Sequence, residues 1–125
     1  MILVYINPRL MIRAYITRRC CMTTLEFLKS TDTDRYGVRP RAICKDGFSI
    51  SIQCSNRHCC WPKPTDIHSV ANNLETVELG WPNTGGKELD SINQYFDAGV
   101  YLYVPIELVE KLIQTHGGIL GAIKR

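Results

Sequence analysis

Apolar and polar residues alternate strictly between positions 48 and 53, where the chain reads Phe-Ser-Ile-Ser-Ile-Gln. A period of two is typical of a β-strand that turns one face to the core. The preceding pair Asp46-Gly47 favours a two-residue type I′ turn, which needs a positive φ at both central positions. We therefore predict a β-hairpin over residues 41–53 whose polar face carries Ser49, Ser51 and Gln53.

Two other segments have helical spacing between recognisable end signals. Thr23 and Glu26 fit a capping box, so we expect a short helix over residues 23–30. Pro105 suits the first position of a second helix, which an apolar stripe continues until a glycine pair ends it after His116.

The remaining segments complete the predicted fold. Strands are expected at residues 74–79 and 99–104, with a helix or loop-helix at 87–96 between them. Residues 55–73 form a long loop in which two prolines disfavour regular pairing. In the last strand, alternation places Tyr101 and Tyr103 together, opposite the aliphatic residues. The order predicts an α+β fold: a small antiparallel sheet, a short N-terminal helix, and helices packed in the C-terminal half.

Residues 1–21 differ in composition from the rest of the chain. They contain four arginines and no acid, and the arginines interrupt every apolar run that a signal peptide needs. Because Met22 is followed directly by the capping box, we expect 1–21 to be an N-terminal extension and 22–125 to form a single domain. The alternative is that Ile2–Ile6 forms a first strand of the sheet.

The charge and hydropathy of the chain limit the functions that we expect of it. The chain carries a net charge of +3, but residues 22–125 hold 11 Lys and Arg against 12 Asp and Glu, a net charge of −1. Binding of a nucleic-acid polymer needs clustered positive charge, so we do not expect it. No apolar run reaches the roughly 18 residues of a membrane span. Because no secretion signal is evident, the default location is the cytoplasm.

The six cysteines and the histidines offer little for catalysis or metal binding. Cys54, His58, Cys59 and Cys60 cluster, but adjacent cysteines without a second Cys pair do not match a zinc site. No nucleophile elbow, glycine-rich phosphate loop or His-x-x-x-His pattern is present. We expect no metal, no cofactor and no enzymatic activity.

Several side chains suit a polar ligand, although each has a plainer interpretation. The serines and Gln53 can hydrogen-bond a ligand, and Arg39 and Arg41 lie near their edge, where an exposed strand edge is the alternative. Tyr101 and Tyr103 suit stacking on a planar ligand or burial against a partner subunit. Phe48 is expected in the core by periodicity, and His116 is expected to interact with its own helix dipole.

An ordered set of segments resembles a family of small phage proteins. These segments are Tyr36–Arg41, Asp46–Gln53, His58–Lys63, Val77–Pro82, and Val100–Pro105 continuing to His116-Gly117-Gly118. The set is similar to the first (type I) family of anti-Thoeris "sponge" proteins, and the likeness covers about residues 22–118. No single one of these segments is specific to the family, whereas the order in which they occur is.

The resemblance implies a function. Such proteins act in the cytoplasm of the infected bacterial host, are not enzymes, and sequester a cyclic ADP-ribose isomer made by a TIR-domain protein. They form homodimers that assemble further, up to hexamers with extra sites for cyclic oligonucleotides. The main alternative that the sequence leaves open is a small phage inhibitor that binds a host protein.

The resemblance also implies a set of ligand-binding residues. Cations would meet the phosphates, aromatic rings the base, and hydroxyl and amide groups the riboses. The family's usual His-Tyr-Cys-x-Pro-Arg segment reads His58-Cys59-Cys60-Trp61-Pro62-Lys63 here, so a lysine replaces a bidentate arginine. The expected site comprises Arg39, Arg41, Phe48, Ser49, Gln53, Arg57, His58, Lys63, Tyr101 and Tyr103.

Overall fold

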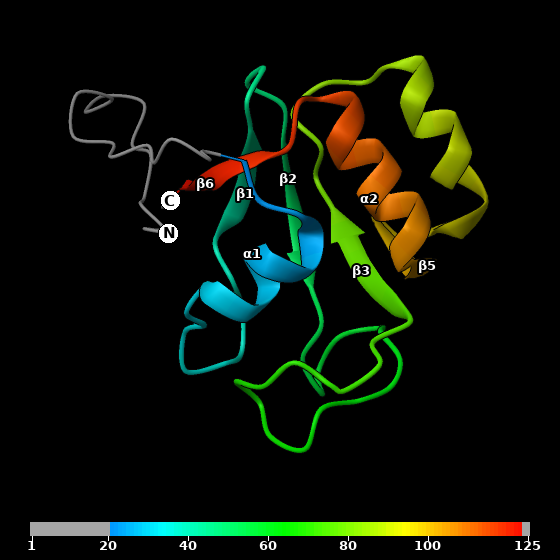
Figure 1. The fold of residues 1–125 in the computed structure, drawn as a ribbon. Coiled ribbons are helices and arrows are strands. Elements are labelled where there is room, and N and C mark those ends of the chain that lie inside the picture. The colour runs from blue at the N-terminus through cyan, green and yellow to red at the C-terminus, as the bar shows by residue number, and fades with distance from the viewer. Residues whose placement is uncertain (1–20, 124–125) are drawn as a thin grey trace.

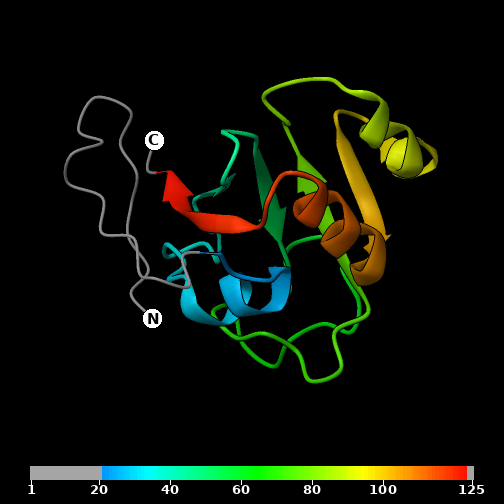
Figure 2. The same ribbon diagram turned by 45° about the horizontal axis from the view of Figure 1, so that its top comes forward.

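The computed structural model describes residues 21–123 of the chain. They form an α+β fold in which one antiparallel sheet carries helices on one face (Figures 1 and 2). The sheet has six strands in the order β4-β5-β3-β2-β1-β6. In chain order, the elements are α1 (Thr24–Ser30), β1 (Arg41–Cys44), β2 (Ser49–Gln53), β3 (Thr76–Gly80), the 3₁₀ helix η2 (Lys87–Tyr95), β4 (Phe96–Asp97), β5 (Val100–Pro105), α2 (Ile106–Thr115) and β6 (Ile119–Ile123).

The face of the sheet that meets the helices is apolar, and we call it the apolar face. Ile52 of β2 lies opposite Leu79 of β3, and both side chains are fully buried. From the helices, Phe27 of α1 and Ile113 of α2 join the same core cluster. Burying such side chains stabilises the fold by about 1.5–3 kcal/mol each.

The capping box predicted for the first helix is confirmed. The Thr23 hydroxyl accepts the Glu26 N–H at 3.1 Å, and the Glu26 carboxylate accepts the Thr23 N–H at 2.9 Å. The last helix is also present, although it begins at Ile106 and Pro105 is its N-cap residue.

The hairpin is confirmed, but its predicted two-residue turn is wrong. Ala42 pairs with Ile50 and the Cys44 N–H bonds to the Phe48 carbonyl, so three residues connect the strands. Gly47 has a φ of +96°, whereas Asp46 is not in the positive region. A three-residue connection needs the left-handed conformation only at its last position, which Gly47 provides.

The prediction that Tyr101 and Tyr103 share a face is wrong because β5 contains a bulge. Val77 pairs with Val104 and Leu79 pairs with Tyr101, so β5 has one more residue than β3 across this interval. The extra residue shifts the side-chain alternation by one position. Tyr101 therefore lies on the apolar face, 7% exposed, whereas Tyr103 is 46% exposed with a φ of +52°.

Two strands, β4 and β6, have no counterpart in the sequence prediction. β6 follows the glycine pair that ends α2 and pairs antiparallel with β1. Met22 also bonds to this strand through both backbone groups of Ile119 and is buried. The predicted extension and its alternative, a strand at Ile2–Ile6, lie outside the described residues, except for Cys21. None of the helices within residues 21–123 combines the length and apolar character needed to cross a bilayer.

Candidate functional site

The opposite face of the sheet, which we call the polar face, is buried rather than open to solvent. Ser49, Ser51 and Gln53 are each no more than 6% exposed. Residues 31–40, which we call the strap, pass along this face. Gln53 holds the strap on this face, because its side chain accepts a hydrogen bond from the Arg39 N–H at 2.8 Å and donates one to the Arg39 carbonyl at 2.9 Å. The amide side chain thus bonds the strap as a neighbouring strand would.

Arg39 carries a buried charge with spare hydrogen-bonding capacity. Its side chain is 3% exposed, and Nε donates to the Leu28 carbonyl at 3.1 Å. Its Nη1 is buried and has no hydrogen-bond partner among residues 21–123. Leaving such a donor unpaired costs about 1–3 kcal/mol or more, so an acceptor next to it is favoured.

A pocket of about 590 Å³ lies between the strap and the polar face. This volume is within the range of about 300–1,000 Å³ that is usual for small-molecule sites. Four parts of the chain build it: the strap, strands β2 and β3, the loop that follows β2, and the turn that follows β3. Its lining residues are Asp32, Thr33, Asp34, Val38, Arg39, Pro40, Ser51, Gln53, His58, Glu78 and Trp81.

Trp81 is the main aromatic residue of this pocket, and sequence reasoning missed it. The residue is 59% exposed and has a φ of +48°, which is uncommon for a bulky side chain. Arg41 holds this turn, because its Nη2 donates to the Trp81 carbonyl and, at 3.0 Å, to the Ser49 hydroxyl. The available signal was a tryptophan placed between Gly80 and Pro82, where a turn holds its side chain outside the core.

His58 lines the pocket from the loop after β2. Its Nδ1 lies 2.6 Å from the hydroxyl of Ser55, which is fully buried. Burial lowers the pKa of His58; Arg39 and Lys63 act in the same direction, while Glu78 and Asp34 oppose them. His58 is therefore neutral at pH 7.

The loop that holds His58 is fixed to the sheet at the β5 bulge. The Tyr103 N–H donates to the Cys59 carbonyl at 3.1 Å, and the Cys59 N–H donates to the Glu78 carboxylate at 2.9 Å. The Lys63 ammonium donates to the His58 carbonyl and lies 6.0 Å from the Tyr103 ring centre. The bulge thus brings Lys63 and Tyr103 next to one another beside His58.

The charge of the pocket lining is mainly negative. Asp32, Asp34 and Glu78 face a single cation, Arg39, because His58 is neutral. The backbone N–H groups of Val38 and Tyr36 lower the pKa of Asp34, which stays ionised. Such carboxylates accept hydrogen bonds from hydroxyl and amino groups of a ligand, whereas an anionic group is best placed toward Arg39 and Lys63.

The structure brings together some of the predicted site residues and separates others. Arg39, Gln53 and His58 line the pocket, Arg41 and Ser49 hold the Trp81 turn, and Lys63 and Tyr103 flank His58. Arg57 has an exposed side chain, and its backbone N–H donates to Ser55. Tyr101 lies on the apolar face, with its ring edge against Phe96.

Phe48 lies away from this pocket, at the other end of β2. Its ring stacks on His116 with the centres 3.9 Å apart, and it is 3% exposed. His116 in turn bonds to Asp46 at 2.7 Å through Nδ1, and its Nε2 lies 2.9 Å from the Glu88 carboxylate. Phe48 and His116 thus join the hairpin turn to α2 and η2.

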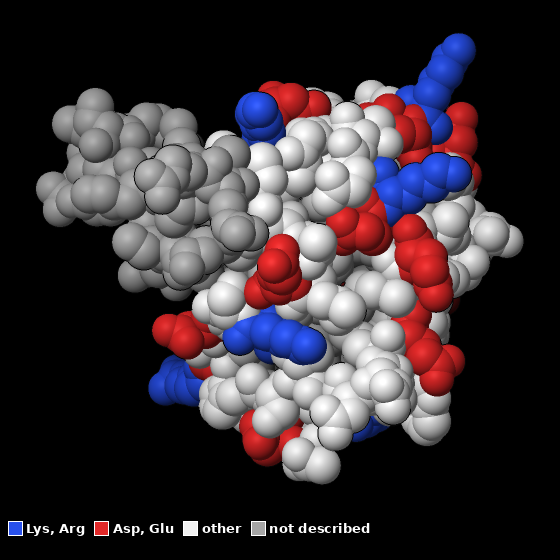
Figure 3. All heavy atoms as spheres, viewed as in Figure 1, with Lys and Arg blue, Asp and Glu red and all other residues white. Residues whose placement is uncertain are grey.

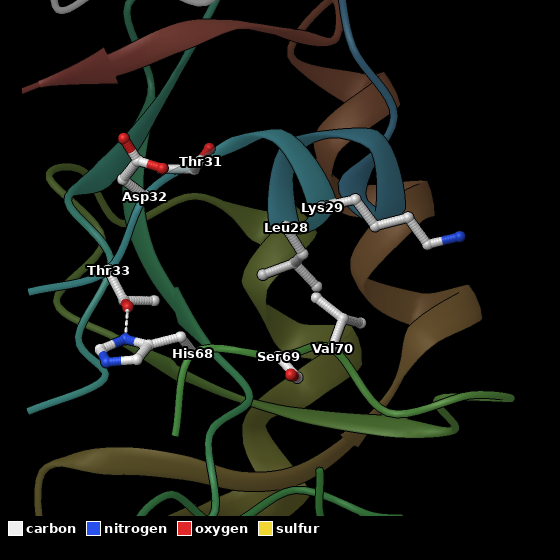
Figure 4. Close-up of a pocket in the computed structure, with 8 residues that line it drawn as sticks. All are labelled: Leu28, Lys29, Thr31, Asp32, Thr33, His68, Ser69 and Val70. Atoms are coloured by element: carbon white, nitrogen blue, oxygen red, sulfur yellow. Dashed lines mark hydrogen bonds between the residues drawn. The ribbon is translucent and has the colours of Figure 1, made fainter. Parts of the chain in front are cut away.

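A second hollow, of about 620 Å³, lies on the other side of the strap (Figure 4). Leu28 and Val70 face one another across it, and His68 bonds to the Thr33 hydroxyl. Lys29 points away from it in this view. The hollow contains no buried unpaired group comparable to Arg39, so we assign the site to the polar-face pocket.

The surface and the cysteines add little further chemistry. Figure 3 shows basic and acidic side chains interspersed over the face viewed, without a continuous basic patch. No cluster of three or more His, Cys, Asp or Glu side chains suited to a metal ion occurs within residues 21–123. Burial raises the pKa of Cys44 to about 12 and that of Cys60 to about 11, so both are thiols at neutral pH.

Comparison of the chain with protein-family models, with curated proteins and with solved structures finds no match. The geometry of the pocket is therefore the basis for assigning a function.

Proposed function

We propose that this protein is a phage-encoded anti-defence protein that binds and sequesters a TIR-derived cyclic ADP-ribose isomer without cleaving it. Sequestration in the cytoplasm of an infected host would block Thoeris-type immunity. The observation that carries the proposal is the polar-face pocket, in which an exposed tryptophan, a buried arginine with an unpaired Nη1 and three carboxylates meet.

The pocket offers a partner for each part of such a nucleotide. Trp81 provides a stacking surface for the base, since aromatic stacking is worth about 1–3 kcal/mol per base. Asp34, Glu78 and the Ser51 hydroxyl suit the ribose hydroxyls. Arg39 and Lys63 are the cations for the pyrophosphate, although the lysine lacks the bidentate geometry of an arginine.

The arrangement favours binding over catalysis. His58 lines the pocket and is hydrogen-bonded to Ser55, which makes this serine–histidine pair a candidate for catalysis. The serine is fully buried, so its hydroxyl cannot reach a bound substrate. A nucleophile must contact the reacting atom and needs an oriented base. The Thr33 hydroxyl lines the pocket and bonds to His68, but no carboxylate within residues 21–123 hydrogen-bonds to the His68 ring to orient it.

A second copy of the chain is part of the proposal. One pocket has three carboxylates around a single lining cation, so a pyrophosphate needs further positive charge. A homodimer or a higher homo-oligomer, up to a hexamer, would supply it from a neighbouring protomer. The exposed rings of Phe96 and Tyr103 are available for such contacts.

One uptake-and-release experiment tests the proposal. The protein is incubated with the product of a TIR-domain enzyme, separated from free ligand, and then heat-denatured. We expect intact nucleotide to be depleted from solution and recovered unchanged after denaturation. Recovery of a cleaved product would indicate catalysis. No uptake would favour the second candidate, an inhibitor that uses the same exposed rings to bind a host protein.

A further inference from the structure

Ser55 and His58 form a tight turn at the wall of the pocket. The His58 N–H donates to the Ser55 carbonyl at 3.1 Å, and the Arg57 N–H donates to the Ser55 hydroxyl oxygen at 3.1 Å. The same hydroxyl lies 2.6 Å from His58 Nδ1. Ser55 is fully buried, so its hydroxyl group is not open to solvent. The contacts with Arg57 and His58 are the hydrogen bonds that this hydroxyl makes within residues 21–123.

The position of the protons in this turn is set by hydrogen-bond capacity. A hydroxyl has one hydrogen to donate and two lone pairs that accept. Arg57 already donates to one lone pair, and His58 Nδ1 is the acceptor that the hydroxyl hydrogen can reach within residues 21–123. If Nδ1 carried a proton instead, the buried hydroxyl hydrogen would have no acceptor, which is unfavourable.

We infer that Ser55 is a positioning residue that holds His58 as the neutral imidazole with its hydrogen on Nε2. His58 then donates this N–H to an acceptor of the bound nucleotide. The second statement rests on the proposed function, whereas the first does not.

The surroundings of His58 support both statements. Nδ1 is bound to Ser55, while no residue within 21–123 hydrogen-bonds to Nε2, although His58 lines the pocket. The charged groups that act on the ring are Glu78, Arg39, Lys63 and Asp34. Because the two cations, Arg39 and Lys63, are the groups that attract anions here, the acceptor that best fits Nε2 is a phosphate oxygen.

The tautomer can be measured without any ligand. In the ¹⁵N spectrum of the histidine-labelled protein at neutral pH, we expect a protonated Nε2 and an unprotonated Nδ1 for His58. Ser55→Thr retains a hydroxyl and should retain this tautomer, whereas Ser55→Ala should give a mixture of both. A circular dichroism spectrum confirms that each variant is folded. A proton on Nδ1 in the unaltered protein would overturn the inference.

Two substitutions of His58 test which of its ring nitrogens binds the ligand. The amide nitrogen of Gln reaches about as far as Nε2, whereas that of Asn reaches only about as far as Nδ1. With cyclic ADP-ribose as the probe, calorimetry should show His58→Gln within about threefold of the parent and His58→Asn weaker by about tenfold or more. His68→Gln and His68→Asn are the matched controls. His68 does not line the pocket, although it bonds to Thr33, which does, so the affinities of these two variants should not differ from one another by tenfold.

The outcomes distinguish the two proposals. Equal affinities of the His58 variants would show that Nε2 does not contact the nucleotide. If the unaltered protein takes up neither cyclic ADP-ribose nor the TIR product, the proposed function and the ligand contact fail together. The spectrum still decides whether Ser55 fixes the tautomer of His58.

Discussion

The two faces of the sheet are both buried, but by different means. The apolar face is covered by α1 and α2, and side chains such as Ile50 and Ile52 fill the space without polar partners. The polar face is covered by the strap. The buried Gln53 side chain hydrogen-bonds to the backbone of Arg39 and to the Ser51 hydroxyl. Within residues 21–123, the pocket of about 590 Å³ that charged groups line lies on the polar face.

The difference shows which face is free to bind a ligand. Apolar packing has no directional requirement, so the apolar face can close completely around its core. Hydrogen-bonded packing closes only where donors and acceptors meet, and the unpaired Nη1 of Arg39 marks a place where they do not. A polar ligand can complete this face at the pocket beside Arg39.

The largest effect is expected for a cavity on the apolar face. Ile52→Ala removes a fully buried side chain from the centre of β2 and should lower the free energy of unfolding by about 2–5 kcal/mol. Chemical denaturation followed by circular dichroism measures this change. Ile52→Val, the matched control, should cost about 0.5–1.5 kcal/mol. A loss below that of the valine variant would mean that this face does not dominate the stability.

A smaller loss of stability is expected for a substitution on the polar face. Gln53→Ala removes the bonds to Arg39 and Ser51, and should lower the free energy of unfolding by about 1–3 kcal/mol because the backbone groups of Arg39 lose their partners. Ser51→Ala deletes one partner and should cost less. If denaturation shows no loss for Gln53→Ala, the strap is held by other contacts.

On the polar face, His58 should also make the free energy of unfolding depend on pH. Burial is the main cause of the lowered pKa of His58, so on acidification the unfolded chain takes up a proton near pH 6.5 before the folded protein does. The free energy of unfolding should therefore fall as the pH is lowered through 6.5. Denaturation at several pH values should give a shallower slope for His58→Gln than for the parent. An unchanged slope in His58→Gln would contradict this origin.

Much of the fold could be predicted because its signals are local. The alternation from Phe48 to Gln53 and the capping box of Thr23 and Glu26 each depend on a few neighbouring residues, and both elements are present. The three-residue turn and the β5 bulge were missed because one added residue depends on pairing with a distant strand. β6 was missed because its short segment has no clear alternation beside the glycine pair.

The candidate site was predicted less completely. The polar face of β2 was identified from its period, but its burial depends on the strap, which the sequence did not place on the sheet. The bulge separates Tyr101 from Tyr103, so the expected pair of stacking rings is not present. Trp81 and Ser55 were not considered because turn residues carry no periodic signal.

The smallest effect on stability is expected at Trp81, the residue to which we assign the stacking contact with the ligand. Trp81 and Trp61 are 59% and 56% exposed, so replacing either by alanine should change the free energy of unfolding little. Only Trp81 lines the polar-face pocket. The pair therefore separates a surface tryptophan that lines the pocket from one that does not.

Calorimetric titration of cyclic ADP-ribose into Trp81→Ala and Trp61→Ala tests the central claim most directly. Loss of a base-stacking ring is worth about 1–3 kcal/mol, so Trp81→Ala should bind about 5- to 150-fold more weakly than the parent. Trp61→Ala should bind with parental affinity. Equal affinities of the two variants would contradict the assignment of the nucleotide site to the polar face of the sheet.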